Sequence, residues 1–387
     1  MKSLYLILMA FIVISCKSPE NGIYQFDPRT LNENEITLSK IADEVTYVTL
    51  DNSIPLGNLF NIEFKDTEIF LATKEIGVLS FDRGGKFIRK IGSIGRGPGE
   101  YIFSIYYTID DKNGTIYVRD QGQVIKVYSR NGQFVRSFSL HQYGENIDYF
   151  KFHDSKLFIT YSVQFNNQKY KWIAFDTLGN VIKIKNRDMP IFNANSGGHE
   201  GIFKFENRIL YWNQYIDTIF SILPDLREKP TLIVTSGEHR MPKSKLSIEQ
   251  FLLGKYMTVY QIFETNRFFI IDFVYLKRAL VLIEKHNQTS YLTYLETEIN
   301  NVSQNDFGGI INDIDGGLNF LPKSYFIENN REYMVGLIDP YKIKVQVKSS
   351  EFKNSVAKYP EKKKELESFA NNLTETDNQV LMIVRLK

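Results

Sequence analysis

A glycine hairpin repeats three times at a fixed interval in this chain. The segments are FDRGGKFI (81–88), YSRNGQFV (128–135) and FDTLGNVI (175–182), and their turn glycines are 47 residues apart. Each segment is typical of two short strands joined by a glycine turn. A hairpin that recurs at a period of roughly 40–50 residues is typical of β-propeller blades. The spacing therefore predicts an all-β fold built from repeated blades.

The composition suits a large β domain and gives no sign of a nucleic-acid partner. Aromatic residues make up 14% of the 387 residues, and such residues favour half-buried strands. Lys and Arg number 47 against 45 Asp and Glu, so the formal net charge is only +2. Nucleic-acid binding would require basic residues clustered on one face. We therefore expect no nucleic-acid partner, and we expect a monomer.

The N-terminus has the pattern of a secretion signal. Lys2 precedes an apolar stretch (4–14) that is too short to span a bilayer as a helix. The stretch ends in VISC (13–16), and Cys16 is the one cysteine of the chain. This ending resembles the bacterial lipobox, in which the peptide is cut before Cys and the new N-terminal Cys carries lipid. An ordinary signal peptide and a buried apolar strand are the alternatives.

The lipobox interpretation divides the chain into three parts. Residues 1–15 are expected to be the signal peptide, residues 16–35 the lipidated Cys16 and a polar tether, and residues 36–387 a single propeller domain. Several acyl chains on one residue would give stable membrane anchoring. With Cys16 used in this way, no thiol remains for a disulfide, thiolate catalysis or a thiolate zinc site.

Strand-like segments account for six blades, the first starting near Leu59. The sixth blade is expected to contain Gly317–Phe320, Ser324–Glu328 and Tyr333–Ile338, and to take its outer strand from Val45–Leu50, so that the two chain ends pair and leave no free edge. Five blades and a separate C-terminal domain is the alternative.

Two helical segments interrupt the β pattern. A short insertion over Lys243–Lys255 has Ser247 as a candidate helix N-cap, and a Lys- and Glu-rich helix is expected from Pro360. The segment Gln379–Leu386 is then expected to close the fold as a strand.

Several motifs together resemble one known family. They are the lipobox, LSKIADEVTYVTL (38–50), the hairpin 81–91, the loop GRGPGEY (95–101), DIDGGLNF (313–320) and the tail DNQVLMIVRLK (377–387). With these motifs the chain is similar to the six-bladed β-propeller lipoproteins of Bacteroidetes, which are related to NHL-repeat propellers. The resemblance implies the fold and a location in the bacterial cell envelope, but no specific activity.

The glycine-rich loop 92–101 points to a candidate binding surface between blades. Its spacing lacks the Lys-Ser/Thr and the following helix of a phosphate-binding loop, so a tight connection between two blades is expected. Such connections lie on one rim of the central channel, and function commonly resides on loops held by a rigid scaffold. The rim candidates for ligand binding are Arg96, Glu100, Tyr101, His141, Glu145, His199, Glu200, His239, Arg240, Asp306 and Asp313.

Metal binding at this rim is the alternative interpretation. His141, His199 and His239 all lie in expected inter-blade loops, and three imidazoles could form a catalytic zinc site with an open position. No pair has the spacing of a known zinc motif, so solvated loop residues are the simpler interpretation. Asp313 and Asp315 suggest part of a calcium loop, but Pro322 stands where the bidentate Glu is required.

The leading hypothesis is a non-catalytic binding module with no cofactor. The module would be lipid-anchored in the bacterial cell envelope, at the outer membrane, and would bind a glycan, a peptide or an envelope protein through the rim. Arg96 and Arg240 would pair with carboxylates or acidic sugars. A metal-dependent lyase or hydrolase with zinc or calcium at the channel mouth is the runner-up, and a scaffold that docks a membrane partner is a third class.

Overall fold

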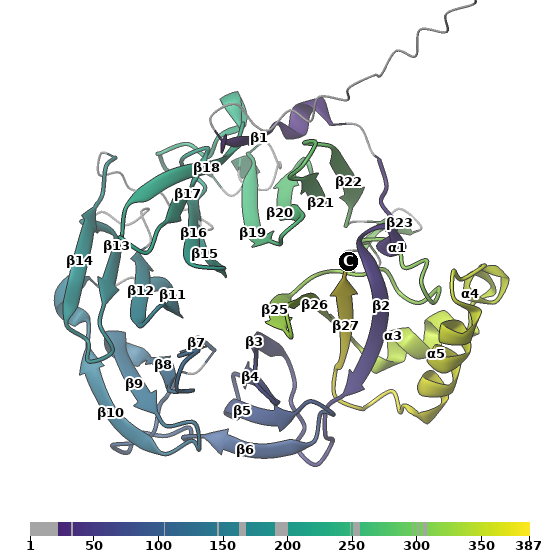
Figure 1. Cartoon of the computed structure of the whole chain (residues 1–387), viewed down its shortest axis with the longest axis horizontal. Coiled ribbons are helices and arrows are strands. Elements are labelled where there is room, and N and C mark those ends of the chain that lie inside the picture. The colour runs from purple at the N-terminus through teal and green to yellow at the C-terminus, as the bar shows by residue number, and fades with distance from the viewer. Residues whose placement is uncertain are drawn as a thin grey trace, which may run out of the picture.

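The chain forms six β-sheets arranged in a ring around a central channel (Figure 1). The computed structural model describes residues 22–31, 34–103, 105–144, 147–161, 168–189, 200–247, 249–250, 256–295, 297–299, 302–304 and 308–387. Each ring sheet contains four antiparallel strands, and one sheet carries a fifth strand on its outer edge. The six-bladed propeller expected from the hairpin repeat is thereby confirmed.

Blades 1 to 3 follow the regular repeat. Their strands are β3 (Leu59–Lys65), β4 (Glu68–Thr73), β5 (Gly77–Asp82) and β6 (Phe87–Ile91); β7 (Tyr107–Ile109), β8 (Ile116–Asp120), β9 (Val124–Tyr128) and β10 (Phe134–Ser139); and β11 (Ile147–His153), β12 (Lys156–Tyr161), β13 (Tyr170–Phe175) and β14 (Val181–Asn186).

Blades 4 to 6 are less regular. Their strands are β15 (Glu200–Phe205), β16 (Arg208–Asn213), β17 (Thr218–Ile222) and β18 (Glu228–Val234); β19 (Thr258–Glu264), β20 (Phe268–Tyr275), β21 (Lys277–Glu284) and β22 (Ser290–Tyr294); and β25 (Ser324–Glu328), β26 (Arg331–Ile338), β27 (Val380–Leu386) and β2 (Ala42–Thr49). A small hairpin, β23 (Thr297–Ile299) and β24 (Val302–Gln304), follows blade 5.

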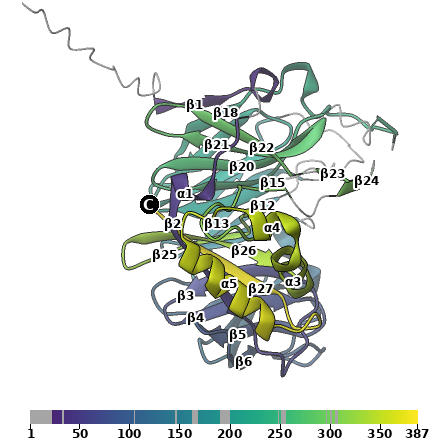
Figure 2. The same cartoon turned by 90° about the vertical axis from the view of Figure 1, so that its right-hand side faces the viewer.

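The strand order gives the disc two distinct faces. In each blade the first strand lies at the channel and the last lies at the outer edge. The inter-blade loops, together with the loops between second and third strands, therefore share one face, here called the rim face. The hairpin turns on the opposite side form the turn face. Figure 2 shows the disc edge-on, with β23 and β24 on the rim face and the C-terminus on the turn face.

The repeated glycines lie where each blade meets the outer strand of the blade before it. Gly85, Gly132 and Gly179 all have positive φ, which favours glycine. A Cβ atom at Gly132 would lie 2.5 Å from the Lys90 carbonyl oxygen, and one at Gly85 would lie still closer to the Thr49 oxygen. These turns therefore need glycine both for their backbone conformation and for the close approach of the neighbouring strand.

A cation follows each of these glycines by four residues and binds the next blade. Arg89 donates to the carbonyl of Arg130 at 2.7 and 3.0 Å, Arg136 donates to the carbonyl of Thr177, and Lys183 donates to the carbonyl of Leu226 at 2.9 Å. The 47-residue period thus repeats an inter-blade contact as well as a hairpin.

The N-terminal segment is bound to the propeller as a strap. Residues 16–35 were expected to hold the lipidated Cys16 and a polar tether. In the described part of this segment, β1 (Tyr24–Phe26) pairs in parallel with β18, and Asn34 bridges Leu292 on β22. Phe26 is only 2% exposed and contacts the ring of Phe273 edge-on at 5.3 Å. Burial of such apolar side chains holds the segment against blades 4 and 5. The N-terminal strap (24–41) ends in the short helix α1 (Leu38–Ile41), which leads into β2.

Blade 6 closes the ring with both ends of the chain. β2 pairs antiparallel with β27 from Ala42–Leu386 to Thr49–Val380, so the expected closure is confirmed. Three helices, α3 (Pro340–Lys348), α4 (Ser350–Asn354) and α5 (Pro360–Asn372), fill the connection between β26 and β27. The helix expected from Pro360 is present, whereas α3 and α4 had no sequence prediction. The expected strand Gly317–Phe320 is wrong, because only Phe320 forms an isolated bridge, to Ile310.

The insertion after blade 4 begins as expected. Ser247 accepts a hydrogen bond from the backbone of Gln250 at 3.1 Å, and the Gln250 side chain accepts one from the Ser247 backbone at 2.9 Å. This reciprocal pair is a capping box, which stabilises the first turn of a helix.

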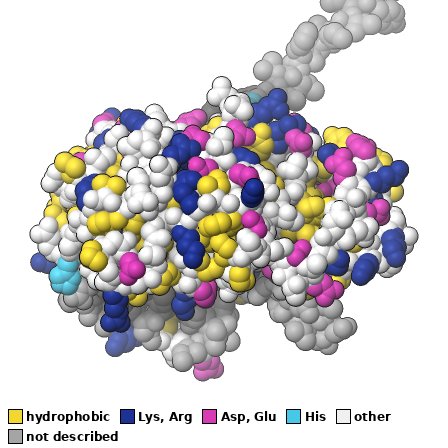
Figure 3. Space-filling model, turned by 90° about the horizontal axis from the view of Figure 1, so that it is seen from below, with side chains coloured by type: hydrophobic (Ala, Val, Ile, Leu, Met, Phe, Trp, Pro, Cys, Tyr) yellow, Lys and Arg dark blue, Asp and Glu magenta, His cyan; other side chains and the backbone are white. Residues whose placement is uncertain are grey.

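The outer strands of blades 1 to 3 carry no further strand in the described part of the chain. Ile88, Val135 and Ile182, at equivalent positions of these strands, are exposed. Figure 3 shows the edge of the disc at blades 1 and 2, where hydrophobic side chains lie among Lys and Arg. Basic residues on an open edge hinder pairing with other strands.

Replacement of Gly132 by alanine tests the inter-blade role of the turn. The added methyl would meet the Lys90 carbonyl, so Gly132→Ala should lose about 1–3 kcal/mol more stability than Gly122→Ala. Gly122 is the matched control, because it also has positive φ but an added Cβ would have no atom within 4 Å. Urea unfolding of both variants measures the difference, and equal losses would contradict the packing role.

Replacement of Phe26 by alanine tests the strap. The loss of a buried aromatic side chain should cost about 3–5 kcal/mol, seen as a lower unfolding midpoint. Gln25→Ala is the control on the same strand, since Gln25 is exposed, and it should change stability by no more than about 0.5 kcal/mol. A Phe26→Ala protein as stable as the control would show that the strap does not support the fold.

Candidate functional site

The loop between blades 1 and 2 is held by hydrogen bonds within itself and to polar side chains of blade 2. The Glu100 carboxylate accepts a hydrogen bond from the Gly97 amide at 2.8 Å, and Asp120 accepts from the amides of Ile102 and Phe103 at 2.8 and 3.1 Å. Lys126 lies 3.6 Å from Asp120 and donates to the Glu100 carbonyl. Glu100, expected to bind a ligand, thus orders the loop instead of extending from it.

Tyr101 attaches the same loop to the core through its buried ring and hydroxyl. Its ring is fully buried, and its hydroxyl donates to the Ile91 carbonyl at 2.6 Å and accepts from the Val78 amide at 3.0 Å. Burial raises the pKa of Tyr101 to about 12, so the hydroxyl stays protonated. Tyr101 is therefore a core residue and is not exposed on the rim.

Arg96 remains available on this ordered loop. Its side chain is exposed, and it makes no ion pair or hydrogen bond within the described part of the chain. Ile94 and Ile102, on the same loop, are also exposed. A guanidinium on an ordered loop, beside apolar side chains, can bind a carboxylate through two parallel hydrogen bonds.

An aromatic cluster lies where this loop reaches the channel, and it was not predicted. The Arg119 guanidinium lies 4.4 Å from the ring centroid of Tyr106 and 5.4 Å from that of Phe103, and Tyr106 contacts Tyr149 edge-on at 6.1 Å. Phe103, Tyr106 and Tyr149 are all partly exposed. The available signal was the aromatic run FSIYY (103–107) directly before an inner strand.

Two ion pairs cross the channel below this cluster. Lys151 of blade 3 pairs with Glu63 of blade 1, and Lys204 of blade 4 pairs with Asp111 of blade 2. Each pair skips one blade, so each spans the channel. Asp111 follows β7 in a hairpin turn, so the Lys204–Asp111 pair lies toward the turn face of the channel.

The histidines of the metal hypothesis are only partly described. His141 is exposed at the start of the 3-10 helix His141–Tyr143, and its ring has no hydrogen-bond partner among the described residues. His239 contacts the ring of Tyr275 at 4.9 Å and lies 3.6 Å from Glu238. His199 lies outside the described residues. Within the described ranges, no three His, Cys, Asp or Glu side chains come together as a metal site.

Arg240 is already paired. Its guanidinium binds both carboxylate oxygens of Asp217, and this carboxylate raises the pKa of Arg240. A hollow beside the pair is lined by Trp212, Asp217, Ser236 and Met257, and its volume of about 20 Å³ suits one water molecule. Arg240 is thus a weaker candidate than Arg96 for binding a ligand.

Glu200 is buried between blades 3 and 4. It is 1% exposed, and its charge raises the pKa of Arg187 against the stronger lowering effect of burial. Glu200 therefore belongs to the interior. Glu145, Asp306 and Cys16 lie outside the described residues.

Asp313 and Asp315 accept hydrogen bonds from several groups on the outside of blade 6. Asp313 accepts from the amide and hydroxyl of Ser39 at 2.8 and 2.7 Å, which ties α1 to this segment. Asp315 accepts from the Tyr47 hydroxyl, the Asn312 amide group and the Gly317 amide at 2.6–2.9 Å. Both carboxylates thus have structural partners within the protein.

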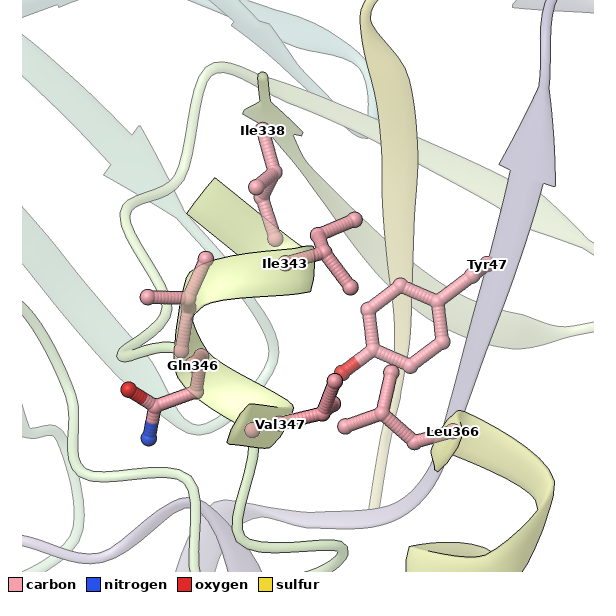
Figure 4. A pocket seen from close by; sticks show the side chains of 8 residues that line it. Tyr47, Ile338, Ile343, Gln346, Val347 and Leu366 are labelled. Atoms are coloured by element: carbon pink, nitrogen blue, oxygen red, sulfur yellow. The ribbon is translucent and has the colours of Figure 1, made fainter. Parts of the chain in front are cut away.

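The neighbouring hollow under α3 is packed with apolar side chains. Figure 4 shows Tyr47 on β2 opposite Ile343 and Val347 on α3, with Leu366 on α5 beside them. The space leaves no room for a water molecule. It is a packing contact between the helices and blade 6, and it offers no ligand site.

Comparison with known families assigns the chain to one of them. A profile described as "Domain of unknown function (DUF4934)" matches residues 14–385. The chain belongs to the DUF4934 family. A search of curated proteins finds no match. Within the described residues, no helix is both long and apolar enough to cross a membrane.

One of the solved structures similar to this DUF4934 chain shares its fold, with a TM-score above 0.5. A protein of Bacteroides fragilis NCTC 9343 whose name describes it as exported has a TM-score of 0.64 at 15% identity, covering 94% of this chain and 99% of that one. A member of the DUF4221 family from Bacteroides vulgatus ATCC 8482 has a TM-score of 0.49 at 13% identity, covering 92% and 99%. At 15% identity, the likeness to the Bacteroides fragilis protein shows the fold alone.

Protonation of Asp315 should affect stability in a defined direction. Burial raises the pKa of this carboxyl, partly offset by its hydrogen bonds. The folded state then binds a proton that the unfolded state releases, so Asp315 favours folding less as the pH rises from below 4 through its folded pKa. Asp315→Asn removes this titration. We expect its melting temperature, relative to the parent, to rise with pH over that window, and a constant difference would contradict it.

Proposed function

We propose that this DUF4934 protein is exported, lipid-anchored at Cys16 in the cell envelope, and binds an acidic ligand on its rim without catalysis. The observation that supports binding is Arg96, an exposed cation with no partner among the described residues, on a loop held by Glu100, Tyr101 and Asp120. Because the loop is already ordered, a ligand would meet little conformational-entropy cost there.

The neighbouring aromatic cluster favours a glycan or an extended peptide as ligand. Partly exposed Phe103, Tyr106 and Tyr149 offer apolar ring surfaces, and Arg119 holds two of these rings in place. Aromatic rings contribute large contact area at low entropic cost. The proposed class is therefore a carboxylate-bearing glycan, such as one with uronic acids.

Export is supported by the sequence and by the name of a structural neighbour, and membrane attachment by the sequence. The segment 1–16 has the order of a signal peptide and lipobox. The name of the Bacteroides fragilis structural neighbour describes an exported protein. The proposed location is the outer membrane of the cell envelope.

Binding to an array of acidic glycans tests the proposal. Arg96→Ala should lose at least about 1.5 kcal/mol of affinity, roughly tenfold, because a charge-assisted pair is removed. Arg227→Ala is the matched control, an exposed arginine on a turn of the turn face, and it should bind like the parent. Circular dichroism checks that both variants are folded. Unchanged binding by Arg96→Ala, or absence of binding by the parent, would refute this site.

A further inference from the structure

The strap determines where the chain leaves the propeller. β1 is the first strand of the described chain, and it lies outside β18 on the edge of blade 4 (Figure 1). Tyr24 pairs with Leu232 and packs edge-on against Phe269 at 4.9 Å, and Phe26 pairs with Val234. The exit point is therefore held by backbone pairing and by two aromatic contacts, so it is a fixed position on the disc.

The direction of β1 points the preceding chain toward the turn face. β18 runs from the turn face at Glu228 to the rim face at Val234, and β1 is parallel to it. Chain before Tyr24 therefore enters from the turn-face side. On the rim side the strap itself fills the edge, because Arg29 lies against Gly237 of the rim loop and is held by both carboxylate oxygens of Asp27.

The length of chain before Tyr24 limits how far the disc can lie from a bilayer. Only seven residues separate Cys16 from Tyr24, and fully extended they span at most roughly 25 Å. Running along β18 from Leu232 back to Glu228 uses about 13 Å of this reach. The strands of blade 4 are about six residues long, so the rim face lies roughly 20 Å beyond the turn face.

We propose that the strapped β1 holds the turn face of blade 4 against the lipid bilayer, so that the rim with Arg96 faces away from the membrane. This inference rests on the proposed lipidation of Cys16. The partner is the bilayer to which the acyl chains attach. The strap thus converts a lipid anchor into a defined orientation of the binding surface.

Fluorescence quenching on vesicles tests this orientation. With its thiol joined to lipid, Cys16 leaves a mature chain to which one new cysteine can be added and labelled. Asp225→Cys places a probe on the turn face of blade 4, and Glu238→Cys places one on its rim face; both positions are exposed. Asn131→Cys and Gln121→Cys are the corresponding turn-face and rim-face positions on blade 2.

The full lipidated protein is bound to phosphatidylcholine vesicles that carry a quencher on the lipid headgroup. We expect strong quenching at Asp225→Cys, weaker quenching at Glu238→Cys, and the least at Gln121→Cys. Asn131→Cys should be quenched more than Gln121→Cys. A spacer of about 20 Gly and Ser residues inserted after Cys16 should remove most of these differences, because such a linker is a flexible coil. Quenching on the rim face equal to or stronger than on the turn face would overturn the orientation.

Vesicle flotation separates this inference from the proposed anchoring. The parent protein should float with vesicles, and Cys16→Ala should not. If the parent carries no lipid and does not float, the proposed anchor fails, and the inference fails with it. If the parent floats but both faces are quenched alike, only the orientation is overturned. Phe26→Asp, which should release β1, is expected to float normally and to lose the difference between the two faces.

Discussion

The propeller depends on the contact between each outer strand and the hairpin turn of the next blade. Two requirements meet there: a glycine that lets the strands approach, and a cation that crosses to a carbonyl of the following turn. Arg89, Arg136 and Lys183 satisfy carbonyl groups that a turn leaves without a backbone partner, and buried polar groups require such partners. Because each blade sets the position of the next, one repeated contact propagates around half of the ring.

This contact explains which parts of the fold the sequence could predict. The hairpin with its glycine is local in sequence, so the repeat predicted the blades. The strand-like segment near Val45, which had no partner in the repeat, predicted the closing strand. The strap could not be predicted in the same way. Tyr24–Phe26 is a three-residue strand in a polar region, and its partner on β18 is far away in the sequence, as the pairing of Tyr24 with Leu232 shows. Its pairing depends on the edge of β18 and on the rings of Phe269 and Phe273, which come together only once blades 4 and 5 have formed.

The sequence did not predict helix α3 or the exposure of the rim residues, and the reasons are related. Ile343, Val345 and Val347 alternate with polar residues, which is a strand pattern, but only Ile343 is fully buried, and Pro340 begins a helix there. On the rim, the sequence predicted Tyr101 and Glu200 in inter-blade loops without fixing the direction of their side chains; Tyr101 does lie in the loop between blades 1 and 2, whereas Glu200 begins β15. Both are directed inward, whereas Arg96 is directed outward. Position along a loop follows from the repeat, but exposure follows from the partners that a side chain finds.

The outer edges of the blades are protected in two ways, by the strap or by basic side chains. Which edges the strap covers bears on how the protein is oriented at a membrane. The strap covers blade 4, touches blade 5 and continues as the outer strand of blade 6. The outer strands of blades 1 to 3 are not covered by another described strand, and they carry five Lys or Arg residues and no Asp or Glu, a composition that opposes edge-to-edge pairing. The covered half is also the half from which the N-terminus leaves. A lipid anchor at Cys16 would therefore bring the turn face of the strapped blade 4 to the membrane. The Arg96 loop between blades 1 and 2, on the opposite face, would remain in solvent where an acidic ligand can reach it.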